Sequence, residues 1–296
     1  MKIEEKKKQK EKKKRSAGSL RNTILLSLLI VMVAGIGVYG WFSVSNKARV
    51  EKLSLIADHQ GNLQIADDTG NGPGIYSSVL ELKDTLNTIL SPVTSKDGVK
   101  FFAPNYDTRT GAVTSVTELT EHTELTKHYI YEKTFYLKAG AEKKSTVANI
   151  ARTYDVALFG LSSNNKEEGC NIYQSDGKNE TAANAIRISF TLDDGTTCVY
   201  EPNSNVHNND NRRAVNGIDN AYGTFTKLYQ QKSDGTFVVS PKVNESEKLF
   251  NIKEDVDVKV TMRIWLEGTD DDCTNSIESD SIVGQIQFIS TEIKSK

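Results

Sequence analysis

An uncharged apolar run is the feature that most constrains the layout of this chain. Residues 23–42 contain no Asp, Glu, Lys, Arg or His over twenty consecutive positions. As a helix, a run of this length spans about 30 Å, which is the thickness of a bilayer hydrocarbon core. Tyr39, Trp41 and Phe42 lie at its downstream edge, where aromatic side chains favour the headgroup region. We therefore expect a single transmembrane helix over residues 23–42.

The charges on the two sides of this run differ in sign. Residues 1–22 hold ten Lys/Arg and three Glu, a net of +7. Subtracting these from the 37 basic and 39 acidic residues of the chain leaves 27 and 36, a net of -9 for residues 43–296. The positive-inside rule then places the basic tail in the cytoplasm and the body outside a cell membrane. The tail suits anionic lipid headgroups, and the acidic body argues against nucleic acid as its partner.

A cleaved export signal is the alternative to a retained anchor. Ser43, Val44 and Ser45 supply small residues of the kind that signal peptidases accept. The apolar run is, however, longer than the usual core of a signal peptide, about 7–15 residues. Both interpretations put residues 43–296 outside the membrane.

The body is predicted to be rich in β-strands. Residues 256–266, VDVKVTMRIWL, alternate between apolar and polar over eleven positions, as a half-buried strand does. Residues 185–192 alternate in the same way, and the turn Asp193-Asp194-Gly195 joins them to a return strand at 196–202. Further strands are expected at 50–56, 62–66, 99–102, 128–138, 154–161, 224–230, 236–240 and 284–290.

One helix is expected in the body. Residues 76–90 carry an apolar stripe at helical spacing and are followed by Pro92. Many strands, one helix and frequent turn signals predict an all-β fold: an antiparallel β-sandwich of jelly-roll or Greek-key type over residues 43–296. The outward face of strand 256–266 carries Trp265, which is either covered by a further layer or exposed as a contact for a partner.

The cysteines are too few for a disulfide framework. Outside a membrane, three cysteines allow one pair and one free thiol. Cys170 and Cys198 flank one predicted strand module, and this disulfide is favoured over pairs with Cys273. The alternative is that all three are reduced and buried.

Two acidic loops are candidate calcium sites. Asp67, Thr69 and Asn71 resemble the first half of a calcium loop, but Ser78 stands where the bidentate Glu belongs. Hard oxygen ligands also cluster after strand 256–266, where a solvated turn is the alternative. The predicted calcium ligands there are Asp270, Asp271 and Asp272, with Glu267 nearby.

No pattern for catalysis or for a cofactor stands out. His122 and His128 are six residues apart, whereas a zinc protease motif needs four. Gly70, Gly72 and Gly74 mimic a phosphate-binding turn, but Ile75 replaces the third glycine of a dinucleotide fingerprint. We therefore expect no cofactor and no catalytic residues.

Several short segments carry a family resemblance. They are residues 41–42 (Trp-Phe), 90–94 (LSPVT), 263–269 (RIWLEGT) and 272–273 (Asp-Cys). Together with the layout, they resemble exported β-rich surface proteins of Gram-positive bacteria and, more loosely, the camelysin- and TasA-like biofilm-matrix proteins. This resemblance implies a jelly-roll fold, with some members assembling into fibres by strand exchange.

These observations predict a non-enzymatic structural or adhesion protein of the cell surface. Its expected partners are membrane lipid, through residues 23–42 and the basic tail, and a cell-envelope protein or polysaccharide. The first alternative is an extracytoplasmic hydrolase with a site assembled from distant loops. A second alternative, a sensor, would need cytoplasmic signalling, for which a tail of 22 residues is too short to form a catalytic domain.

Overall fold

A computed structural model describes parts of the body and one residue before it, Ser27. Residues 46–296 form one compact unit. The described residues are 27, 47–57, 63–83, 88–95, 97–107, 113–140, 152–159, 169–175, 181–202, 228–231, 237–239, 242–243, 246–270, 272–273, 277 and 281–293. The predicted tail and, apart from Ser27, the predicted span lie outside them. No helix within these ranges is long and apolar enough to cross a membrane.

One sheet, which we call sheet B, is built around the strand that the sequence predicts most clearly. Its order is β13-β12-β11-β10-β16-β7-β2, and every neighbouring pair is antiparallel. β16 lies in the middle, between β10 and β7. The strands are β2 (Leu63–Asp67), β7 (Ile130–Ala139), β10 (Ile186–Leu192), β11 (Thr197–Tyr200), β12 (Leu228–Gln231), β13 (Phe237–Val239) and β16 (Val258–Leu266).

A second sheet, sheet A, contains both the first and the last strand of the body. Its order is β14-β15-β8-β17-β1-β3, with β4 also on β1 and β9 also on β17. β1 and β17 run parallel, an exception to the antiparallel arrangement that the sequence predicts. The strands are β1 (Ala48–Ala57), β3 (Val79–Glu81), β4 (Thr88–Leu90), β8 (Thr153–Leu158), β9 (Asn171–Gln174), β14 (Lys242–Val243), β15 (Ser246–Lys253) and β17 (Ser281–Glu292).

The two sheets face each other across one apolar core. Phe288 of sheet A stands 5.8 Å from Phe135 and 5.6 Å from Phe190 of sheet B, measured between ring centroids. On β16, the predicted inward residues Val260, Met262, Ile264 and Leu266 are buried, each contributing about 1.5–3 kcal/mol. The prediction of an all-β body is confirmed.

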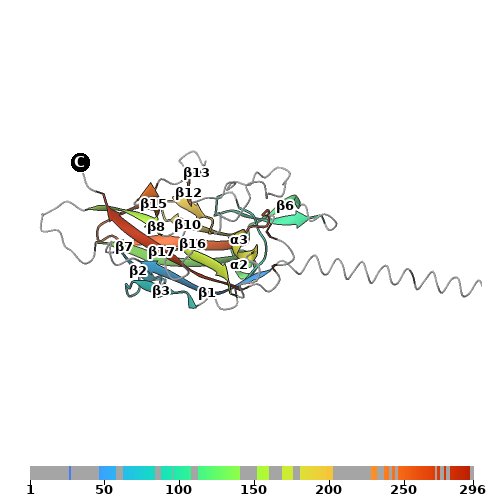
Figure 1. The fold of residues 1–296 in the computed structure, drawn as a ribbon, viewed down its shortest axis with the longest axis horizontal. Helices are drawn as coiled ribbons and strands as arrows, with labels where there is room; N and C mark the ends of the chain where they lie inside the picture. The colour runs from blue at the N-terminus through green and yellow to red at the C-terminus, as the bar shows by residue number, and fades with distance from the viewer. Residues whose placement is uncertain are drawn as a thin grey trace, which may run out of the picture. The chain divides into compact units, whose positions relative to one another are not determined.

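Short elements cover one part of sheet B. The hairpin of β5 (Phe101–Tyr106) and β6 (Val113–Leu119) forms a separate two-stranded sheet, and Phe102 is also bridged to Thr94. Figure 1 shows it, with the helices α2 (His122–His128) and α3 (Thr181–Ala185), at one end of the sheets. The hairpin and α2 build the surface considered below.

The predicted helix at 76–90 is wrong. Val79 and Leu80 pair with Ile56 and Leu55 in a strand on β1, and Thr88–Leu90 forms a second strand on the same edge. The segment's apolar stripe fits either structure in part, and its Ser and Thr residues favour helix interiors weakly. Pairing with an otherwise open edge of β1 decides the outcome for the described residues.

Candidate functional site

The polar side chains of interest lie on the outer face of sheet B, the face turned away from the shared core. Side chains alternate between faces along a strand, so residues that are directly opposite on neighbouring strands share a face. Opposite pairs on β10 and β16 are Arg187 with Trp265, and Thr191 with Thr261. This register gathers charged and hydroxyl groups from several strands on one surface.

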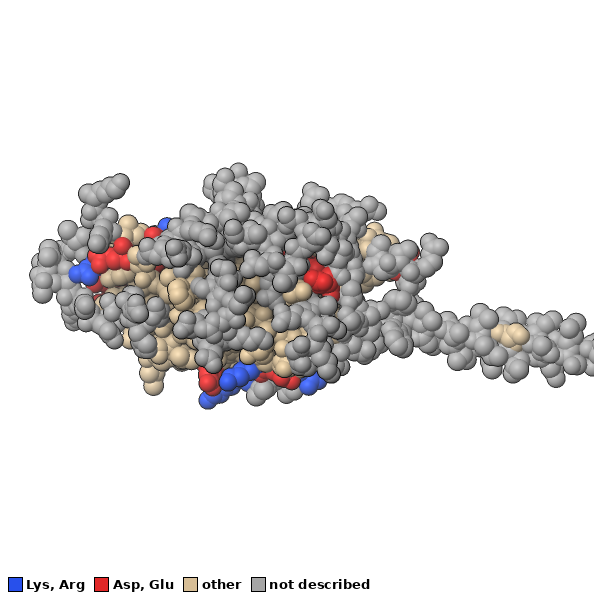
Figure 2. Space-filling model, viewed as in Figure 1, with Lys and Arg blue, Asp and Glu red and all other residues tan. Residues whose placement is uncertain are grey.

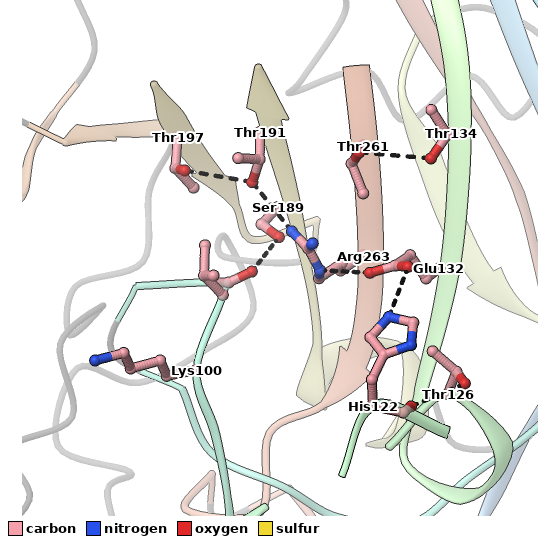
Figure 3. Close-up of polar contacts among 12 residues, drawn as sticks. Lys100, His122, Thr126, Glu132, Thr134, Ser189, Thr191, Thr197, Thr261 and Arg263 are labelled. Atoms are coloured by element: carbon pink, nitrogen blue, oxygen red, sulfur yellow. Dashed lines mark hydrogen bonds and ion pairs between the residues drawn. The ribbon is translucent and has the colours of Figure 1, made fainter. Parts of the chain in front are cut away.

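A row of hydrogen bonds crosses this face from α2 to β11 (Figure 3). His122 Nε2 lies 3.1 Å from Glu132 Oε1, and the other oxygen of Glu132 accepts from Arg263 Nε at 2.7 Å. Arg263 also donates to Thr191 Oγ1 at 3.2 Å, and Thr197 donates to the same oxygen at 3.3 Å. The His122 side chain is 70 % exposed, whereas Arg263 and Glu132 are 17 % and 20 % exposed. The row is therefore anchored in the sheet and open at its histidine end.

A second charged group is buried beside this row. The Nη2 atom of Arg187 lies 2.6 Å from Glu201 Oε1 and 2.7 Å from Asp270 Oδ2. All three side chains are less than 5 % exposed. Burial alone would lower the pKa of Arg187, but the charges of Glu201, Asp270 and Glu267 outweigh it and raise the pKa. The guanidinium thus stays charged and holds the loop after β16 against the end of β11.

Trp265 lies beneath the covering layer and is fully buried, so the exposed alternative is wrong. Its ring meets Phe101 of β5 edge-on, with centroids 5.3 Å apart, and its Nε1 donates to Glu267 Oε2 at 3.1 Å. The other oxygen of Glu267 accepts from the Thr269 backbone and hydroxyl. Glu267 therefore accepts three hydrogen bonds, which fix the indole and the following turn.

A small second core forms under the hairpin. Its buried members are Val93, Phe101, Leu125, Ile130, Val199 and Trp265. A turn before β5 closes over it at Gly98, where a Cβ would stand 2.5 Å from Ser189 Cβ. The Ser189 hydroxyl donates to the Gly98 carbonyl at 2.8 Å. Gly98 has a φ of 67°, so glycine meets both the backbone and the steric requirement there.

In the predicted calcium loop after β16, Asp270 is bonded to other groups of the protein. One oxygen of Asp270 bonds Arg187, and the other accepts from the Asp272 backbone at 2.9 Å. Asp271 lies outside the described residues. Among the described residues no three His, Cys, Asp or Glu side chains gather as a metal site. Asp270 is thus bonded within the protein, and calcium binding by this loop stays a prediction.

The other predicted loop, residues 67–78, is a compact turn at the far end of β1. Asp67 pairs with Lys133 at 2.9 Å, and Asp68 pairs with Lys259 at 3.4 Å. The first oxygen of Asp68 accepts from the Gly70 backbone, a bond that lowers the pKa of this carboxyl. The acidic groups of this half-loop are thus bonded to lysines and to their own turn.

Another three-residue contact holds the same turn to the sheet. Tyr76 Oη donates to Asp257 Oδ1 at 2.7 Å, and Lys138 Nζ lies 2.7 Å from the same oxygen. The Lys138 ammonium also stands 4.6 Å from the centre of the Tyr76 ring. Ile75, next to this anchor, is 94 % exposed.

The predicted disulfide is not formed in this structure, since all three cysteines are free and buried. The Cys170 thiol lies 3.5 Å from the Gln287 carbonyl, and Cys198 lies 3.2 Å from the Leu249 carbonyl. Burial raises the pKa of each of these thiols to about 12. The cysteines therefore act as small apolar core residues.

Sequence reasoning missed the buried Arg187 group and the row through Arg263. The one available signal was a charged residue at an outward position beside Trp265 in the predicted register. The partners Glu201 and Glu132 are distant in sequence and follow only from the fold. No family model matches the chain, and a comparison with curated proteins finds no match either.

Proposed function

We propose that this protein is a structural or adhesion module of the cell surface, without enzymatic activity. In this proposal residues 23–42 span the membrane once, residues 1–22 are cytoplasmic, and the body is an extracytoplasmic sandwich of jelly-roll type. The uncharged run with its asymmetric flanks supports the topology. The resemblance to exported β-rich surface proteins supports the location.

The observation that carries the non-enzymatic part is the pairing of charges on the outer face of sheet B. Arg187 and Arg263 are each bonded to carboxylates, and Glu267 holds three donors. Charged groups that are bonded to one another hold their part of the fold in place. General acid–base catalysis instead needs a base that is within hydrogen-bond reach of the proton it takes. Polar groups held in a fixed arrangement suit a structural module that recognises another protein or a polysaccharide.

Two measurements on intact cells test the proposal. Protease added to protoplasts that express the full chain with an N-terminal tag should digest the body and spare the tag. Surface cross-linking should then recover envelope proteins or polymers with the unmodified chain and equally with His122→Ala. Protection of the body would refute the topology. A discrete substrate-processing complex whose turnover is lost in His122→Ala would favour the extracytoplasmic hydrolase instead.

A further inference from the structure

Exposed basic side chains lie beside an exposed apolar one at the end of the body where β1 begins. Arg49 and Ile89 are directly opposite in the β1–β4 pair, so their side chains lie side by side on one face. Both are exposed, with Ile89 at 42 %. Lys47 precedes the strand and is exposed as well. Figure 2 shows basic and acidic side chains together along the lower border of the body.

The last turn of α2 belongs to the same end. β4 runs antiparallel to β1, so Leu90 pairs with Ala48 at the start of β1. The next residue, Ser91, donates its backbone N–H to the carbonyl of His128 at 2.9 Å. Lys127 and His128 therefore stand at this end, and both are exposed.

Three basic side chains at this end are candidates for contact with a negatively charged partner. Lys47, Arg49 and Lys127 form no ion pair within the part of the chain that the structure describes. Two carboxylates lie nearby. Glu51 accepts a hydrogen bond from the Ser281 hydroxyl at 2.7 Å, which leaves its charge in place, and Glu124 lies 3.6 Å from His128. The end thus combines free positive charge with an exposed apolar side chain, although the body as a whole is acidic.

Chain length ties this end to the predicted membrane span. If the span ends at Phe42, six residue steps reach Ala48, a distance of no more than about 20 Å when fully extended. β1 itself is ten residues long, or about 30 Å. The turn with Ile75 follows the other end of β1, where Ala57 bonds Ser78. In the proposed single-pass topology, a tether of this length limits how far the start of β1 can lie from the bilayer.

We propose that the body docks on its own membrane through Lys47, Arg49, Ile89 and Lys127, and that anionic lipid is the ligand of this surface. This inference rests on the proposed single-pass topology. The cations meet lipid phosphates, and Ile89 enters the headgroup region. The acidic remainder of the body is repelled by the same surface, which orients the cationic end toward it.

Lipid quenching of a single placed tryptophan tests this docking. The full chain with Trp41→Phe is reconstituted into vesicles whose lipids carry bromine on the acyl chains near the headgroup. One set contains phosphatidylglycerol, and the other is phosphatidylcholine alone. Ile89→Trp is the probe, and Ile75→Trp is its matched control at the other end of β1. Trp265 is fully buried and gives a constant background. Lys127→Trp is a second probe if Ile89→Trp does not fold.

The expected result is strong quenching of Trp at position 89 in the phosphatidylglycerol vesicles and little at position 75. Adding Lys47→Glu and Arg49→Glu should weaken the docked state at least about 25-fold, since each cation near an anionic surface contributes about fivefold. Quenching at position 89 should then fall to the level at position 75.

Co-flotation with the vesicles separates the two proposals. A chain that floats but shows equal, weak quenching at both positions keeps the anchor and overturns the docking. Equal quenching in both lipid sets overturns the role of anionic lipid. A chain that does not float overturns the anchor, and the docking with it.

Discussion

Removing the buried guanidinium should destabilise the body strongly. Arg187→Met keeps most of the side-chain volume but leaves Glu201 and Asp270, both less than 5 % exposed, without their cation. Breaking a buried ion pair by removing one partner costs about 3–5 kcal/mol. For a body of this size, each kcal/mol shifts Tm by about 2–4 °C, so we expect a fall of about 6–20 °C.

Arg263→Met is the matched control for this prediction. It removes the same kind of side chain from the same face, but its pair with Glu132 is 17 % and 20 % exposed. A partly exposed pair contributes less than a fully buried one, so Tm should fall clearly less than in Arg187→Met. Thermal unfolding of the full chain in detergent, followed by near-UV circular dichroism, measures both variants under one condition.

The pH dependence tests the reason for the loss. In Arg187→Met the cost arises from uncompensated negative charge, and protonation of the carboxylates removes that charge. The deficit relative to the unmodified chain should therefore be largest near neutral pH and shrink as the pH falls. Equal Tm values for Arg187→Met and Arg263→Met, or a deficit that does not change with pH, would refute the argument from buried charge.

Three further predictions follow from burial and pairing. Ile264→Asp places an unpaired charge in the shared core and should abolish the near-UV circular dichroism of the folded body; a wild-type Tm would place β16 at a wet edge instead. Cys170 and Cys198, with pKa values raised to about 12 by burial, should resist iodoacetamide at neutral pH and react fully in urea, as peptide mapping would show. Hydrogen bonds, first from Lys138, lower the pKa of Asp257; its contribution is therefore present above the unfolded pKa and is lost as pH falls through the folded value. Asp257→Asn should flatten a small, salt-sensitive loss of stability below about pH 4, and an unchanged acid limb would contradict this.

Local alternation predicted the centre of the fold. Strands β16 and β10 could be predicted because their apolar residues recur at every second position. The turn between β10 and β11 could be predicted from its Asp-Asp-Gly sequence. The same pattern predicted which side chains of β16 face the core. Exceptions come at its start, where Val256 precedes the strand and is 44 % exposed.

Features that depend on contacts between distant segments could not be predicted from the sequence. Residues 79–81 and 88–90 form strands because β1 offers them an edge, a fact absent from their own sequence. The parallel pairing of β1 with β17 joins segments more than 200 residues apart. Neither the buried partners of Arg187 nor the cover over Trp265 leaves a periodic signal in its own segment.

The covering of Trp265 and the burial of Arg187 have one cause. These two residues are directly opposite on neighbouring strands, so a layer that covers the indole also takes the guanidinium out of water. A buried arginine needs carboxylates, and Glu201 at the end of β11 and Asp270 after β16 are the groups that this register brings within reach. The acidic run after β16 suggests a metal site when the sequence is read alone. In the structure, one of its carboxylates, Asp270, is the counter-charge of Arg187. That counter-charge is needed because both faces of the sheet are covered at this point.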